Sequence, residues 1–210
     1  MNRPAEDGRQ RAPIIFYFDF VSPFAYLGSI AIERLAAELG RDVHWRPVLI
    51  GVTILKIMGM KPLRDVPLKG PYLKHDLERL SAWFGVDVPR HGFGSVSSVN
   101  ACEAFLDISE RDPEQGKAFA RAIFDRLWRR GVDITSADAI EQIARDQGLD
   151  LRALGSPASR ARLRGAVDAA VAAGVFGVPS FVADGELFFG NDHLWMLEHW
   201  LRNHSFFREN

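Results

Sequence analysis

From Ile14 to Leu27 the chain reads Ile-Ile-Phe-Tyr-Phe-Asp-Phe-Val-Ser-Pro-Phe-Ala-Tyr-Leu. The first part of this stretch, through Phe18, is apolar and aromatic, which is typical of a buried β-strand. Ser22 is a favoured helix N-cap, and Pro23 suits the first helical position, where a backbone N–H has no intrahelical partner. The stretch therefore predicts a strand that leads directly into a helix, whose N-terminus is a natural place to hold an anion.

The middle of the chain is predicted to be mostly helical. Apolar residues recur at helical spacing up to Gly40, and Val43 to Leu49 is predicted as a second strand, with Pro47 favouring the edge of a sheet. From about Gly51 to Ser156 the pattern predicts only helices and loops. The helices expected there cover residues 72–84, 100–109 with Asn100 as cap, 112–131, 136–148 and 150–154.

The C-terminal part of the chain mixes helix and strand again. Residues 157–173 have a helical pattern, and residues 177–183 predict a turn followed by a strand. Asp184-Gly185 is a strong hairpin signal, so residues 186–189 are expected to return as a second strand. The final helix is predicted to open at Gly190-Asn191-Asp192.

This order of elements predicts an α/β fold with a thioredoxin-like layout and an all-helical insertion. The thioredoxin-like domain is expected to be discontinuous, formed by residues 12–50 and 157–204. Residues 51–156 form the expected insertion, and the polar residues 1–11 are predicted to be a disordered tail.

Composition excludes several classes of protein. The 210 residues carry a formal net charge of −1, so there is no basic surplus for binding a nucleic-acid backbone. No apolar run approaches the ~20 residues of a membrane-spanning helix, and the first residues lack the apolar stretch of a signal peptide. Cys102 is the only cysteine, which rules out an intramolecular disulfide and a cysteine-based metal site and favours a cytosolic location. We interpret Cys102 as a small buried residue rather than a reactive one.

Five motifs follow one another in a recognisable order. They are Phe-Asp-Phe-Val-Ser22-Pro23-Phe-Ala-Tyr-Leu-Gly, Arg46-Pro47-x-Leu49-x-Gly51, Pro67-x-Lys69-Gly-x-Tyr72, Gly174-Val-Phe-Gly177-Val-Pro179-Ser-Phe and Phe189-Gly190-Asn191-Asp192. Together they resemble the 2-hydroxychromene-2-carboxylate isomerases and kappa-class glutathione transferases, which are relatives of the DsbA-type disulfide oxidoreductases. Two positions depart from the family pattern: Met60 follows Gly59 where Asn is common, and Glu103 stands where many members have Arg.

The resemblance implies a glutathione site at the start of the first helix. Ser22 and Ala25 occupy the positions of the two cysteines in thiol oxidoreductases of this fold, so the protein cannot itself form the redox disulfide. Ser22 would instead donate a hydrogen bond to the thiolate of bound glutathione and lower the pKa of that thiol. The other residues implied in glutathione binding are Pro23, Phe24, Lys69, Val178 before a cis Pro179, Asn191 and Asp192.

Each of these residues also has a structural interpretation. Ser22, Asn191 and Asp192 are good helix caps, and Lys69 resembles an ordinary surface lysine. Asp19 is interpreted as the partner of Arg46 in a buried pair that orders the first two strands, in preference to a catalytic role. Four aromatic residues either line a substrate pocket or belong to the core: Phe24, Tyr72, Trp83 and Phe93. The histidines lack metal-ligand spacing, so no metal site is predicted.

The resemblance implies a glutathione-dependent isomerase that acts on an intermediate of aromatic degradation by reversible thiolate addition. A kappa-like glutathione S-transferase is the alternative among enzymes. A non-catalytic thioredoxin-like binding or chaperone module is the alternative of another class. The resemblance also implies a homodimer, with an aromatic small molecule and glutathione as ligands.

Overall fold

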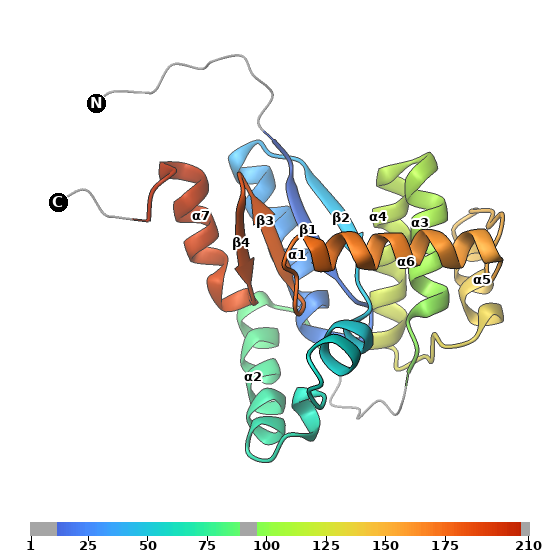
Figure 1. The fold of residues 1–210 in the computed structure, drawn as a ribbon, viewed down its shortest axis with the longest axis horizontal. Helices are drawn as coiled ribbons and strands as arrows, with labels where there is room; N and C mark the ends of the chain where they lie inside the picture. The colour runs from blue at the N-terminus through green and yellow to red at the C-terminus, as the bar shows by residue number, and fades with distance from the viewer. Residues whose placement is uncertain (1–11, 89–95, 207–210) are drawn as a thin grey trace.

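The computed structural model describes residues 12–88 and 96–206 and contains a four-stranded mixed sheet (Figure 1). Its order is β2-β1-β3-β4, so β2 and β4 are the edges. Strand β1 pairs in parallel with β2, whereas the β1–β3 and β3–β4 pairs are antiparallel. The strands are β1 (Ile14–Phe18), β2 (Val43–Pro47), β3 (Ser180–Ala183) and β4 (Glu186–Phe189). The expected α/β fold of thioredoxin type is confirmed, and so is the edge position of Pro47.

Helices cover both faces of this sheet (Figure 1). The helix α1 (Pro23–Leu39) begins after the N-cap Ser22 and ends at Gly40, whose φ of 60° is left-handed, as predicted. It belongs to the main core together with α7 (Leu194–Asn203). Helix α6 (Pro157–Ala172) packs on the opposite face through Ala170, in a second cluster with Val48 and Val175.

The middle of the chain is helical, as expected, but several boundaries differ. Helix α2 begins at Lys69 rather than Tyr72, and α3 begins after Ser98, so Asn100 is not a cap. The Asn100 side chain instead donates to the Thr135 carbonyl oxygen. The elements are η1 (Gly51–Ile57), η2 (Leu63–Asp65), α2 (Lys69–Phe84), α3 (Val99–Arg111), α4 (Pro113–Phe124), η3 (Asp125–Arg129) and α5 (Ala137–Asp146).

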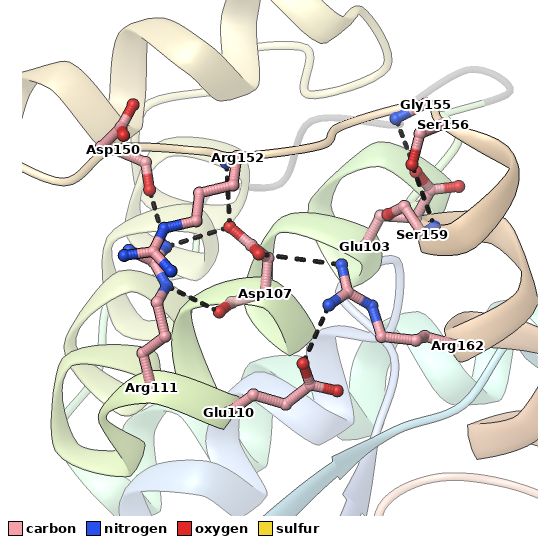
Figure 2. Close-up of polar contacts among 10 residues, drawn as sticks. All are labelled: Glu103, Asp107, Glu110, Arg111, Asp150, Arg152, Gly155, Ser156, Ser159 and Arg162. Carbon is pink, nitrogen blue, oxygen red and sulfur yellow. Dashed lines mark hydrogen bonds and ion pairs between the residues drawn. The ribbon is translucent and has the colours of Figure 1, made fainter.

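The predicted helix at residues 150–154 was wrong. This segment is irregular because its backbone groups bond to side chains of α3 instead of to one another (Figure 2). Arg152 N–H donates to Asp107, and Gly155 N–H donates to the buried Glu103. The Asp150 carbonyl oxygen accepts from Arg111.

The core continues from the sheet into the middle helices. One cluster of buried side chains includes residues of β1, β2, α1, α3, α4 and α7. At its centre lies the ring of Phe18. Its centroid is 5.2 Å from the ring centroid of Phe105 in α3 and 5.8 Å from that of Phe124 in α4. The domain boundaries at residues 50/51 and 156/157 stay a prediction. Within residues 12–88 and 96–206, no helix is both long enough and apolar enough to cross a membrane.

The predicted hairpin between β3 and β4 is confirmed. Asp184 and Gly185 have φ values of 51° and 89°, as a tight turn of this kind requires. Asp184 also forms a partly buried ion pair with Arg41, which follows α1. The last helical region differs from the prediction, since a 3₁₀ turn, η4 (Asn191–His193), precedes α7.

The close contact between α3 and α4 gives a stability test. A Cβ on Gly116 would lie 2.7 Å from Ser109 Cβ and 2.9 Å from Ser109 Cα, so Gly116→Ala should lower the free energy of unfolding by about 1–3 kcal/mol. Gly165→Ala in α6 is the matched control, because a Cβ there meets nothing within 4 Å, and it should stabilise by roughly 0.5–1 kcal/mol. Urea denaturation checks both. Equal effects of the two variants would contradict the packing argument.

Candidate functional site

Three segments meet at one end of the sheet. Strand β1 ends there before Ser22, β3 begins there after Pro179, and β4 ends there before Gly190, because β3 is antiparallel to both of its neighbours. The register pairs Ser180 with Tyr17 and with Phe189. The topology thus places the start of α1, the proline loop and η4 at the same edge.

Ser22 is the N-cap of α1 and is almost fully buried, with 6 % of its surface exposed. Its Oγ accepts a hydrogen bond from Ala25 N–H at 3.1 Å, and its own N–H donates to the Asp19 carbonyl oxygen at 3.0 Å. The capping interpretation is therefore confirmed. Since Oγ acts as the acceptor in this bond, the hydroxyl proton is available to donate to a ligand.

The Val178-Pro179 peptide bond is cis, as predicted. The Pro179 carbonyl oxygen accepts from Gly190 N–H at 2.9 Å, which joins the proline loop to η4. Both segments approach Gly28 on α1: a Cβ there would lie 3.0 Å from Pro179 Cβ and 2.8 Å from Asn191 Oδ1. Only glycine permits this approach. Gly28 was not among the predicted site residues, although a glycine inside a helical pattern often marks close packing.

Asn191 binds α1 directly. Its Nδ2 donates to the Phe24 carbonyl oxygen at 2.9 Å, while its Oδ1 is buried without a hydrogen-bond partner. Asp192 has a largely exposed side chain near His193. The prediction that one of these residues caps the last helix was wrong: α7 has His193 at its N-cap and no side-chain cap, because η4 intervenes.

The remaining site residues differ in exposure. Pro23 and Phe24 are half-buried in the first turn of α1. Lys69 is exposed at the first position of α2, and its contact with glutathione stays a prediction. Tyr72 and Trp83 are exposed, which excludes the core interpretation for them; Phe93 lies outside the described residues.

Asp19 is fully buried, but its partners are not those predicted. Arg46 is exposed on β2, so the expected buried pair does not form. The Asp19 carboxylate accepts instead from Val21 N–H at 3.2 Å and from Ile50 N–H at 2.9 Å, and the Ser98 side chain lies near it. Burial raises the pKa of this carboxyl above its ordinary value of 3.8, although the hydrogen bonds act in the opposite direction.

Cys102 is fully buried, as the sequence analysis predicted. Burial, reinforced by the nearby Asp19 charge, raises the pKa of its thiol well above the ordinary value. The thiol therefore stays neutral at physiological pH and acts as a small packing group.

The comparisons with known proteins agree with this geometry. Residues 13–202 match the family model described as a DSBA-like thioredoxin domain. The chain belongs to the DsbA-like thioredoxin family. Within this family it is 34 % identical to a 2-hydroxychromene-2-carboxylate isomerase of Sphingobium xenophagum over 193 residues, covering 90 % of this chain and 97 % of the relative.

Two further relatives extend the comparison. The kappa 1 glutathione S-transferase of Rattus norvegicus is 29 % identical over 201 residues, with 88 % of each chain covered. A solved structure of a 2-hydroxychromene-2-carboxylate isomerase superposes with a TM-score of 0.79 at 28 % identity, covering 91 % of this chain and 95 % of that one. The relatives are thus isomerases and glutathione transferases.

The buried Asp19 carboxyl gives a pH test. Because its folded pKa lies above the unfolded value, its contribution to stability is fully present below pH 3.8 and is lost as the pH rises through the folded pKa. The free energy of unfolding of the wild type, minus that of Asp19→Asn, should therefore fall as the pH rises above 3.8. Urea denaturation at several pH values measures this difference. A difference that stays constant or rises with pH would contradict the direction of the shift.

Proposed function

We propose that this protein is a glutathione-dependent isomerase of the 2-hydroxychromene-2-carboxylate isomerase type, acting on an intermediate of aromatic degradation. The observation that carries the proposal is the Ser22 hydroxyl, held at the N-terminus of α1 at the same end of the sheet as the cis Val178-Pro179 bond. The 34 % identity with an isomerase over most of both chains supports it.

The residues present fit a thiol ligand. The partial positive charge of a helix N-terminus favours a thiolate, and the Ser22 proton is free to donate to it. A free thiol with a pKa of ~8.5 is mostly protonated at neutral pH, so these groups would increase the fraction of thiolate. Bound glutathione would supply a thiolate that adds reversibly to a conjugated acceptor and leaves again.

The other proposed contacts hold the remainder of glutathione. Val178, before the cis proline, offers its backbone to the cysteinyl part, and Pro23 and Phe24 line the start of α1. The exposed carboxylate of Asp192 would pair with the ammonium group of glutathione, with Asn191 beside it. Lys69 would pair with a carboxylate of the peptide. A homodimer and a cytosolic location stay predictions.

Ser22→Ala tests the central role. It should cost about 1 kcal/mol of stability through the lost cap and should also lower turnover and the proton release on glutathione binding. Ser156→Ala is the matched control, since Ser156 caps α6 in the same way, accepting from Ser159 N–H at 3.1 Å. It should lose similar stability and keep full activity. Calorimetry across pH 6–9 and steady-state assays measure these quantities. Unchanged turnover in Ser22→Ala would contradict the role of Ser22, and no turnover in the wild type would favour a non-catalytic binding module.

A kappa-like transferase is the second candidate, favoured by the 29 % identity with the rat enzyme. Product analysis separates the two activities. An isomerase should leave the amount of free glutathione unchanged while the substrate is converted, whereas a transferase should consume one glutathione per conjugate formed. Recovery of a stable conjugate as the main product would contradict the isomerase assignment.

A further inference from the structure

We propose that Asp19 is a positioning residue that fixes the segment Gly51–Val88, here called the arm, relative to Ser22. The arm contains η1, η2 and α2 and carries Lys69. The inference rests on the proposed function because it takes Lys69 as a glutathione ligand. Asp19 itself would not touch glutathione.

The carboxylate of Asp19 connects the Ser22 turn with the start of the arm. One oxygen, Oδ1, accepts from Val21 N–H at 3.2 Å, within the turn that ends at Ser22. The other, Oδ2, accepts from Ile50 N–H at 2.9 Å, directly before the arm begins. A rotation of this carboxylate would therefore disturb both segments together.

Ser98 lies near the same carboxylate, at the start of α3. Ser98 stands at the N-cap of α3, where a serine hydroxyl usually accepts from a backbone N–H, but it makes no side-chain cap hydrogen bond. Its side chain lies beside both Asp19 and the Cys102 thiol and acts to lower the pKa of each. The buried carboxylate is thus bound to the chain at Ile50, before the arm, and lies beside Ser98, where α3 begins.

Among its described hydrophobic side chains, the arm packs only shallowly on the core. Its hydrophobic contacts with the core come from partly buried residues, namely Val52, Leu77, Leu80, Phe84 and Val86, together with the buried Val88. Several of its large apolar side chains are exposed, including Ile57, Met58, Met60 and Leu68. We infer that the Asp19 hydrogen bonds, rather than deep packing of the arm, set where Lys69 lies relative to Ser22.

A double-mutant cycle on glutathione affinity tests this inference. In Asp19→Asn the amide nitrogen cannot accept from a backbone N–H, so one of the two backbone hydrogen bonds is lost, and glutathione should bind about tenfold more weakly. Lys69→Ala should also weaken binding. Because Asp19 acts through the arm, the double variant should bind no more weakly than the weaker-binding single variant. Additive losses would overturn the proposal.

Asp107→Asn is the matched control for a general loss of stability. Asp107 is also a buried carboxylate, accepting from Arg111 at 3.0 Å and Arg152 N–H at 3.1 Å, but it joins α3 to the segment before α6 (Figure 2). Its variant should lower stability and leave glutathione affinity and the Lys69→Ala effect unchanged. If Asp19→Asn does not fold, Ser98→Ala replaces it, because no capping bond is lost there.

Amide hydrogen exchange without glutathione provides an independent measurement. Asp19→Asn should speed exchange in η1 and α2, whereas Asp107→Asn should not. If the wild type binds no glutathione, or Lys69→Ala leaves the affinity unchanged, the proposed ligand assignment fails and exchange alone decides the role of Asp19. Unchanged exchange in the arm of Asp19→Asn would overturn that role.

Discussion

The structure depends on the packing of Phe18 at the end of β1. Its ring contacts Trp45 of β2, Phe105 of α3 and Phe124 of α4, with centroid distances of 5.4, 5.2 and 5.8 Å. The sheet and the middle helices therefore share one aromatic core. Because a close-packed interior allows little independent movement, the residue that follows Phe18 is fixed relative to both. That residue is Asp19, from which the turn to Ser22 starts.

Local signals in the sequence predicted those parts of the fold that local chemistry determines. Helix α1 begins after Ser22 and ends at Gly40 because capping depends on the chemistry of the cap residue. Asp184-Gly185 forms the hairpin turn because these two residues readily adopt positive φ values. The cis peptide at Pro179 and the placement of Asn191 near α1 depend on distant parts of the chain. The first was predicted only through the family resemblance, and the contact of Asn191 with Phe24 was not predicted.

The errors came from contacts between distant segments. Arg46 was predicted to pair with Asp19, but alternate residues of β2 point to opposite faces, so Val43, Trp45 and Pro47 are buried and Arg46 is exposed. This alternation in the sequence could have predicted that Arg46 is exposed. Residues 150–154 have a helical pattern, yet hydrogen bonds to α3 hold them in an irregular form. Glu103 accepts from Gly155 N–H at 2.8 Å. In this chain the position therefore shapes the segment before α6.

Two negative charges must be accommodated near the same turn if a thiolate binds at Ser22. The Asp19 carboxylate lies within that turn and is buried, so an unsolvated charge there would oppose a second anion. The Val21 and Ile50 N–H groups donate to the carboxylate and offset its charge, while the positive end of the α1 dipole lies at Ser22. The N–H groups that hold the turn in place thus also reduce the repulsion between Asp19 and an anionic sulfur at Ser22. This explains how the buried Asp19 is tolerated so close to the proposed site.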